Sequence, residues 1–301
     1  MYMQMLLWLL FLPVVLSCSW NYRFDSCDNH FNIVYPDKNA VYFGMVIPFG
    51  SRRFGMFSDV HPISTYFSIQ IYEQGGATTH YNDAQLLSGS GYNISVSLKP
   101  QVSYFALFRI YVPKVNYWGG VPPNTIVDGH IVPRCDIEYN QQGNIYTNLT
   151  YGIHVDTGTV CAKNSEFMFM DVPAGSLTNA DANYMIACVS PAQYRIDIRM
   201  PATQENGDGE LRYASISLVS TSAPRPTVWT TQITTNFSME ILVPNEVSYP
   251  AILYRQILPS PKFEHSIANA KSKCFDYVEN KYDDKCISHV MGDYYPIIEL
   301  I

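Results

Sequence analysis

The stretch YFSIQI, from Tyr66 to Ile71, places apolar residues at every second position, with the polar Ser68 and Gln70 between them. This alternation predicts a β-strand with one face buried. A near-copy, YASISL from Tyr213 to Leu218, occurs much later in the chain. The same kind of strand is therefore used twice, and the rest of the sequence is interpreted around these two copies.

A second motif follows each copy at nearly the same distance. FRIYVP places Arg109 41 residues after Ser68, and YRQILP places Arg255 40 residues after Ser215. One such match could arise by chance between unrelated strands, but two motifs in one order at one spacing indicate a repeat. The sequence therefore predicts two structurally equivalent β units.

Most other segments also have the composition of strands. About ten short stretches rich in β-branched and aromatic residues end at Pro or Gly, and helical periodicity is scarce between them. We expect a mainly β protein made of two tandem, related β-sandwich units of jelly-roll type. The first unit is expected at residues 20–135 and the second at residues 136–301.

One helical pattern lies near the C-terminus. Ser260 can cap a helix and Pro261 can occupy its first turn, and apolar residues then recur every three or four positions up to Val278. We expect one C-terminal helix from Pro261 to Val278, packed against a sheet. The alternative is a loop held by a bond between Cys274 and Cys286.

Four blocks of the sequence resemble segments of the exported proteins that contain the domains of unknown function twelve-fifty-four and twelve-fourteen. The blocks lie between Val41 and Ala270 and read TYFSIQIYEQGG…YNDAQL, RIYVPKVNYWGGVPPNTI, LRYASISL and AILYRQILPSPKFEHSIANA. The resemblance implies an exported, β-rich protein of two units. It brings no established activity and no catalytic residues, and it does not include the cysteines or the C-terminal tail.

The first residues have the features of a secretory signal peptide. An apolar run of 11 residues, Leu6 to Leu16, is broken by Pro13, followed by small residues, and too short to span a bilayer. We expect residues 1–19 to be removed, the protein to be secreted to the extracellular space, and the mature chain to have no membrane span. The alternatives are an uncleaved anchor and a bacterial lipoprotein modified at Cys18.

Cleavage at that position leaves an even number of cysteines. Six cysteines can form three disulfides in an oxidising compartment, and the local pair Cys274 and Cys286 is the simplest pairing. The alternative is six free thiols in a reduced protein. None of the spacings is C-x-x-C, which argues against structural zinc, and we expect neither a metal nor a cofactor. The six are Cys27, Cys135, Cys161, Cys188, Cys274 and Cys286.

Three triplets match the signal for N-linked glycosylation, at Asn93, Asn148 and Asn236. They predict a glycoprotein if the host is eukaryotic. The formal net charge of −7, with no run of Lys or Arg, argues against nucleic acid as a partner, because binding to phosphates needs clustered positive charge.

The sequence THYND supplies the best candidates for catalysis. His80, Tyr81 and Asp83 follow the opening strand of the repeat, where loops beside a rigid sandwich often carry sites. Together with Arg109 they could act as acid, base and charge neutraliser in the cleavage of an acidic polysaccharide. The alternative is that they are ordinary turn residues. No G-x-S-x-G motif of a serine hydrolase occurs.

Arg109 and Arg255 occupy equivalent places on strands that are otherwise apolar. In a structural interpretation each pairs with a buried carboxylate or with strand carbonyls, because an unpaired buried guanidinium is strongly unfavourable. In a functional interpretation the two form an anion-binding pair that faces a cleft between the units.

The loop from Asn116 to Pro133 is the best candidate for a recognition surface. Tyr117 and Trp118 could stack on the apolar faces of sugar rings, and His130 lies in the same loop. The alternative is an irregular linker whose Trp118 fills the junction between the units.

These observations favour a secreted glycoprotein with an extracellular binding or structural role and a glycan as its partner. The alternative function is a secreted polysaccharide-cleaving enzyme, either a lyase or a glycoside hydrolase. The sequence predicts no oligomeric state.

Overall fold

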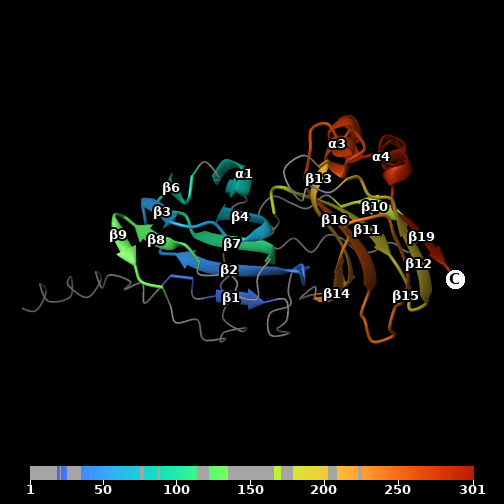
Figure 1. Cartoon of the computed structure of the whole chain (residues 1–301), viewed down its shortest axis with the longest axis horizontal. Coiled ribbons are helices and arrows are strands. Elements are labelled where there is room, and N and C mark those ends of the chain that lie inside the picture. Colours follow the sequence, from blue (N-terminus) through green and yellow to red (C-terminus); the bar gives the residue numbers. More distant parts are fainter. Residues whose placement is uncertain are drawn as a thin grey trace, which may run out of the picture.

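The computed structural model describes residues 19–20, 22–25, 35–74, 78–86, 89–113, 122–134, 166–170, 179–202, 209–222 and 226–301. Strands dominate these residues and form antiparallel sheets grouped in two bodies that lie side by side (Figure 1). The predicted class, mainly β with related sandwiches, is confirmed. The expected unit boundary at residues 135 and 136 lies outside the described residues, as do residues 1–18 of the expected signal peptide.

The first sandwich consists of a five-stranded and a four-stranded sheet. The five-stranded sheet has the order β1 (Tyr22–Asp25), β2 (Ala40–Ile47), β7 (Tyr104–Pro113), β4 (Ser64–Glu73) and β5 (Thr78–Asn82). The four-stranded sheet has the order β6 (Tyr92–Ser97), β3 (Arg53–Ser58), β8 (Asn124–Val127) and β9 (His130–Val132), and a short helix, α1 (Asp83–Leu86), follows β5. Apolar side chains at alternate positions of both sheets form one core, which includes Phe43, Phe54, Phe67 and Phe108.

The second sandwich consists of a five-stranded and a three-stranded sheet. The five-stranded sheet has the order β10 (Phe167–Phe169), β11 (Ala182–Cys188), β16 (Pro250–Pro259), β13 (Leu211–Ser220) and β14 (Thr227–Gln232). The three-stranded sheet has the order β15 (Phe237–Leu242), β12 (Gln193–Ile198) and β19 (Ile297–Leu300). Tyr194, Ile196, Ile198 and Met200, at alternate positions of the stretch YRIDIRMP, are all buried in this core.

The two sandwiches repeat one strand order. β2, β7 and β4 are neighbours in the first five-stranded sheet, as β11, β16 and β13 are in the second. Ser68 lies directly opposite Arg109 in the first sheet, and Ser215 lies directly opposite Arg255 in the second. The two motifs of the sequence repeat therefore fall on corresponding strands in the same register.

Even the local distortions recur. Val112 and Leu258, each three residues after the repeated arginine, have left-handed φ angles of 46° and 47°. Their N–H groups donate to the carbonyl oxygens of Asn39 at 2.8 Å and Asp181 at 3.1 Å, respectively. Each bond ties the end of the strand to the turn that precedes the neighbouring strand of its sheet.

The C-terminal helix is shorter than predicted. α3 runs from Ile267 to Lys273, and its N-cap is Ser266, whose side chain accepts a hydrogen bond from the N–H of Asn269. Ser260 instead accepts a bond from the N–H of Lys262 in a preceding turn. Val278, the expected end of the helix, is 95% exposed. The segment after Cys274 is extended and forms a hairpin of β17 (Phe275–Asp276) and β18 (Lys281–Tyr282), followed by α4 (Asp284–Met291) and a 3₁₀ turn, η1 (Gly292–Tyr294).

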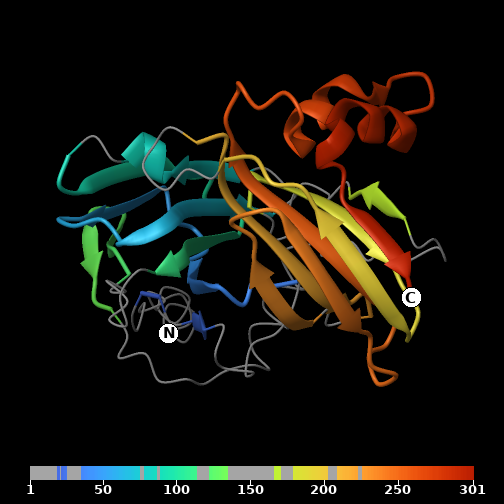
Figure 2. The same ribbon diagram turned by 45° about the vertical axis from the view of Figure 1, so that its right-hand side comes forward.

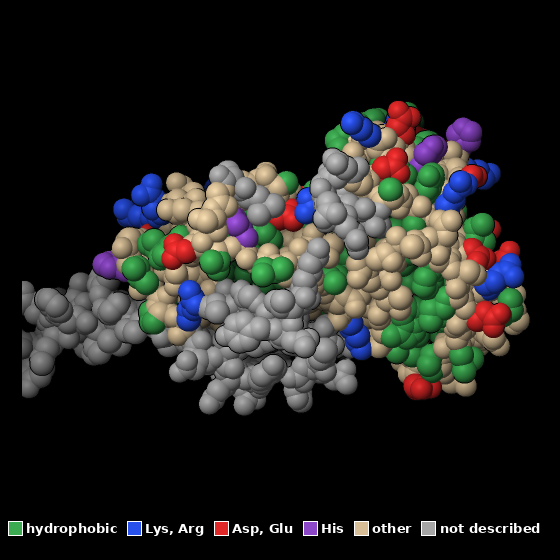
Figure 3. Space-filling view, in the orientation of Figure 1, with side chains coloured by type: hydrophobic (Ala, Val, Ile, Leu, Met, Phe, Trp, Pro, Cys, Tyr) green, Lys and Arg blue, Asp and Glu red, His purple; other side chains and the backbone are tan. Residues whose placement is uncertain are grey.

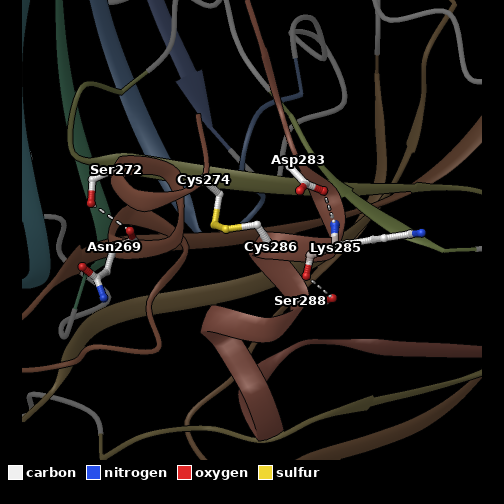
Figure 4. The surroundings of a disulfide bond; sticks show 7 residues. All are labelled: Asn269, Ser272, Cys274, Asp283, Lys285, Cys286 and Ser288. Atoms are coloured by element: carbon white, nitrogen blue, oxygen red, sulfur yellow. Dashed lines mark hydrogen bonds between the residues drawn. A yellow bond between two sulfur atoms is a disulfide. The ribbon is translucent and has the colours of Figure 1, made fainter. Parts of the chain in front are cut away.

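The predicted bond between Cys274 and Cys286 is present and joins the end of α3 to the first turn of α4 (Figure 4). Asp283 caps α4 by accepting a hydrogen bond from the N–H of Lys285. Cys188 is also disulfide-bonded. Cys27, Cys135 and Cys161 lie outside the described residues. Both helices cover one end of the second sandwich (Figure 2).

The five-stranded sheets are buried on both faces. One face of each contributes to the core of its own sandwich, and the opposite faces of the two sheets meet in a further cluster that contains Tyr66, Tyr111, Tyr213 and Ile257. This explains why strand β7 is apolar at nearly every position, since a strand buried on both faces needs apolar side chains on both. We call the surface where the two five-stranded sheets meet the junction.

Candidate functional site at the junction of the two sandwiches

Tyrosine rings form the apolar part of the junction. Tyr111 of β7 packs edge to face on Tyr213 of β13, with ring centroids 5.2 Å apart, and on Tyr66 of β4 at 5.5 Å. Burial raises the pKa of Tyr213 and of Tyr66 well above the ordinary value, and the nearby carboxylates Asp37 and Asp181 act in the same direction. These hydroxyl groups therefore stay protonated and act as hydrogen-bond donors at neutral pH.

Two equivalent turns cross the junction. The turn at Asp37 to Asn39 precedes β2, and the turn at Asn179 to Asp181 precedes β11. In each turn the first side chain accepts a hydrogen bond from the N–H two residues later, at 2.8 Å from Asn39 and 3.1 Å from Asp181. Such local bonds are why Asp and Asn favour tight turns. Each turn then reaches the five-stranded sheet of the other sandwich.

The first turn places a buried carboxylate on the second sandwich. The side chain of Asp37 is fully buried and accepts hydrogen bonds from the hydroxyls of Tyr213 at 2.9 Å and Ser215 at 2.7 Å, and from the guanidinium of Arg255. Arg255 also donates to the carbonyl of Tyr35 at 3.0 Å. Burial acts to lower the pKa of Arg255, but Asp37 and the surrounding tyrosines outweigh it and raise the pKa, so the guanidinium remains charged.

The second turn makes the reciprocal contact on the first sandwich. Asp181 accepts hydrogen bonds from the hydroxyl of Tyr66 at 2.7 Å and from Nε2 of His80 at 2.7 Å. Burial acts to raise the pKa of Asp181, but the bond and charge of His80 and the bond from Tyr66 outweigh it, and the pKa lies below the ordinary value. Because the ionised carboxylate can only accept, the proton of this bond lies on Nε2 of His80. Asn179 accepts a further bond from Tyr66 at 3.1 Å.

A second ion pair joins the sandwiches beside this histidine. Arg212 of β13 donates to the carboxylate of Asp83 at 2.7 Å. Burial raises the pKa of Asp83, while the charge of Arg212 opposes that rise. The Asp83 side chain is 4% exposed and that of Arg212 is 20% exposed, so water screens this pair only weakly.

Arg109 occupies the place equivalent to Arg255 but has different partners. It donates to the side-chain oxygen of Gln70 at 3.1 Å and to the hydroxyl of Tyr72, and its guanidinium lies 5.7 Å from the centroid of the Tyr72 ring. Burial raises the pKa of Tyr72 to about 12, and the charge of Arg109 opposes the rise. Gln70 also accepts a bond from the N–H of Ala180 in the second turn, so Arg109 is linked to the other sandwich through Gln70.

The junction thus brings together four of the residues singled out in the sequence, His80, Asp83, Arg109 and Arg255. Tyr81 is not among them, because the alternation of β5 turns its side chain towards the core of the first sandwich. His130 lies on β9, far from the junction and exposed (Figure 1). Tyr117 and Trp118 lie outside the described residues.

Sequence reasoning missed the partners of these residues. Asp37 and Asp181 stand in turns, three and one residues before the next strand begins, and aspartate side chains are mostly exposed to solvent. The available signal was the similarity of DKNA before β2 and NADA before β11, which extends the repeat to the turns.

The arrangement fixes a proton on Nε2 of His80 and contains two buried ion pairs, Asp37 with Arg255 and Asp83 with Arg212. These contacts join the two sandwiches. In the described part of the chain, no group of three or more His, Cys, Asp or Glu side chains is placed to hold a metal ion. None of the helices described there has the length and apolarity needed to cross a lipid bilayer.

No protein-family model and no curated protein matches the chain. Among solved structures, it is similar to an uncharacterised protein of Burkholderia cenocepacia, with 10% identity, 82% of this chain and 81% of that chain covered, and a TM-score of 0.49. It is also similar to the VPA0106 protein of Vibrio parahaemolyticus, with 7% identity, 88% of this chain and 90% of that chain covered, and a TM-score of 0.42. Tandem CBM51 modules of a Streptococcus pneumoniae family 98 glycoside hydrolase match with 10% identity, 72% of this chain and 76% of that chain covered, and a TM-score of 0.18. Likenesses this weak carry no argument about function.

Proposed function

We propose that the protein is a secreted, disulfide-bonded glycoprotein with an extracellular binding or structural role, and that its ligand is a glycan. The observation that carries the proposal is that His80 and Asp83 are engaged in contacts between the sandwiches and Arg109 in contacts within its own sandwich. His80 bonds Asp181, Asp83 bonds Arg212, and Arg109 is held by Gln70 and Tyr72. Groups committed in this way fix two sandwiches as one body, which suits a binding scaffold better than a reaction site.

Two features support export. Cys274 is bonded to Cys286, and Cys188 is also disulfide-bonded, and such bonds persist in oxidising compartments. The apolar run from Leu6 to Leu16 supplies a signal for secretion. A count of thiols on the denatured, unreduced protein tests this part, and six reactive thiols would contradict it.

The ligand is tested with the full-length secreted protein and a panel of acidic and neutral glycans. We expect a saturable change in tryptophan fluorescence with at least one glycan, and no product. Replacing Trp118 by Ala should abolish the response, whereas replacing Trp229, a partly buried residue of β14, should leave it intact. Loss of binding in both variants, or in neither, would contradict the assignment of the ligand to Trp118.

The same incubations test the alternative function. Release of new reducing ends or unsaturated sugars, abolished by His80→Ala or Tyr81→Phe in variants that melt like the wild type, would replace the proposal with a polysaccharide-cleaving enzyme. Saturable binding without such products supports the proposal.

A further inference from the structure

A shallow groove of about 490 Å³, widely open to solvent, lies on the second sandwich, away from the junction. Its walls come from the end of β12, the start of β15, the start of β19 and the segment of η1. Figure 3 shows acidic and basic side chains interspersed at this end of the molecule, over β12 and β19.

One glycosylation triplet forms part of the groove itself. Asn236, Phe237 and Ser238 are three consecutive lining residues, and Asn236 and Ser238 are exposed. The carboxamide of Asn236 has a fixed orientation, because its oxygen accepts a hydrogen bond from the N–H of Met200 at 3.0 Å. A backbone N–H needs an acceptor, so the oxygen faces Met200 and the nitrogen Nδ2, the atom that would carry a sugar, points away from that bond.

The remaining walls have the mixed chemistry that a sugar ring requires. Tyr295 and Ile297 offer apolar surface, and Tyr295 is held in place by a bond from its hydroxyl to the carbonyl of Phe167. Asp197 and Arg199 also line the groove and supply hydrogen-bonding groups. A pyranose ring has apolar faces and a perimeter of hydroxyls, so it can pack on the first set while bonding to the second.

Other side chains constrain the positions of Asp197 and Arg199. The carboxylate of Asp197 accepts a bond from Nε of Arg195 at 3.1 Å, and the guanidinium of Arg199 pairs with Asp293. Arg199 also lies over the ring of Tyr294, 5.6 Å from its centroid. These contacts limit the movement of both polar side chains.

We infer that this groove seats the first sugars of an N-linked glycan carried by Asn236 of the same chain. Nδ2 attacks the anomeric carbon of an oligosaccharide that begins with N-acetylglucosamine and is supplied as a lipid-linked diphosphate. The C–N bond forms, the bond from that carbon to the diphosphate oxygen breaks, and the proton lost from Nδ2 balances the charge of the departing diphosphate. The inference rests on the export that the proposed function includes, and not on the identity of any external ligand.

Asn93 provides an internal comparison. It is exposed on β6, the edge strand of the four-stranded sheet in the first sandwich, and it is remote from this groove. A glycan there would extend into solvent, whereas the glycan on Asn236 would be in contact with protein.

The test uses the full chain secreted from a eukaryotic cell line. Peptide mass spectrometry reports occupancy, and an endoglycosidase that cuts between the first two N-acetylglucosamines reports access. We expect Asn236 to be occupied and its glycan to be cut about tenfold more slowly in the native than in the denatured protein, as when the undocked form is about one-tenth of the population. Ile297→Ser, which alters an exposed wall residue, should remove that protection without affecting the rate at Asn93.

Ser238→Ala abolishes the triplet while leaving Asn236 and its bond to Met200 in place, and Ser95→Ala is the matched change at Asn93. Ser238→Ala should lower the melting temperature of the glycosylated protein and Ser95→Ala should not. Secretion with a bare Asn236, or with a glycan that is cut equally fast in native and denatured protein, overturns the inference but leaves the proposed function standing. Retention of the protein in the cell with all its thiols free overturns both this inference and the proposed function.

Discussion

Asp37 is a single side chain on which three residues of the other sandwich converge. Replacing it by Asn keeps the shape but removes the charge that Arg255 faces in a fully buried place. Leaving one member of a buried ion pair without its partner costs about 3–5 kcal/mol, so we expect Asp37→Asn to lower the free energy of unfolding by that amount. Urea denaturation measures the change, with Asp59→Asn at an exposed site as the control.

A double-mutant cycle measures the interaction energy of Asp37 with Arg255 separately from the effects of their other contacts. Removing both charges with Asp37→Asn and Arg255→Met should destabilise less than the sum of the single changes, because neither charge is then left buried alone. Additive effects would show that the two side chains do not act on each other and would contradict the interpretation of Asp37 as the counter-ion.

Asp181 gives the junction a dependence on pH. Its pKa is depressed in the folded protein, so it contributes stability that is fully present above the pKa of an unfolded aspartate, about 3.9, and is lost as pH falls through the folded value. The wild type should therefore lose more stability than Asp181→Asn between pH 5 and the acid limit of about pH 2. Urea midpoints across this range provide the measurement, and parallel curves for the two proteins would contradict it.

Asp83 makes a contribution to stability that depends on pH in the opposite direction. Its pKa is raised in the folded protein, so protonation favours folding and a fall in pH through the raised pKa adds stability relative to neutral pH. The two carboxylates lie at the same junction but must be measured in separate variants, since their contributions partly cancel in the wild type.

At the scale of residues, the sequence predicted which cations would need partners but not what the partners would be. Arg109 and Arg255 stand out because they interrupt apolar strands, and that signal is local. Asp37 and Asp181 gain their roles only when two sheets from distant parts of the chain face each other, which no local pattern encodes. Tyr81 is a different case, because the alternation of THYN could have placed it on the core side.

At the scale of elements, the disulfide between Cys274 and Cys286 defines the C-terminal segment. It closes a loop with a sequence separation of 12, and a disulfide around a loop of about 15 residues contributes about 3 kcal/mol. We expect Cys274→Ala with Cys286→Ala to destabilise the protein by about 2–4 kcal/mol. The hairpin that carries the exposed Tyr277 and Val278 should then become the first site of proteolysis.

Limited proteolysis and thermal melting with and without a reducing agent measure these effects. Reduction of the wild type should reproduce the proteolysis pattern of the double variant. Reduction of the double variant should not change its first site of cleavage. First cleavage elsewhere in both proteins would contradict the assignment.

The same segment shows where element boundaries escaped prediction. Phe263, Ile267, Ala270 and Cys274 of the expected helix are buried as predicted, but Val278, its expected end, is 95% exposed. Helical spacing alone could not reveal that Ser266 is a better cap than Ser260, or that the chain turns back after Cys274 to pair Phe275 with Tyr282. The strands were easier to predict, because alternation of apolar and polar residues bounded by Pro and Gly is a strong signal of a strand. The repeat provides this signal twice.

At the scale of the whole molecule, the sandwiches contact each other as the subunits of a symmetric dimer would. Asn39 bonds Tyr213 of the second unit, and its counterpart Asp181 bonds Tyr66 of the first. Reciprocal contacts between equivalent residues are the mark of a twofold interface. The sequence predicted two equivalent units, but their mutual orientation follows from side chains whose contacts are all between distant parts of the chain.

This coupling makes a prediction about cooperativity. Two sandwiches with separate cores would unfold in two steps unless their interface contributes enough free energy to join the transitions. The buried ion pairs and tyrosines of the junction provide that contribution, so calorimetry of the wild type should show one transition with equal calorimetric and van't Hoff enthalpies. Combining Asp37→Asn, Asp83→Asn and Asp181→Asn should split it into two.

A matched triple variant distinguishes loss of coupling from a general loss of charge. It changes three exposed carboxylates to their amides, at Asp59, Glu246 and Glu264. Surface carboxylates contribute little to stability, so this protein should still melt in one transition. Two transitions in the wild type, or a single transition in the variant that combines Asp37→Asn, Asp83→Asn and Asp181→Asn, would contradict this prediction. The contacts of the junction would then contribute too little free energy to make the two sandwiches unfold together.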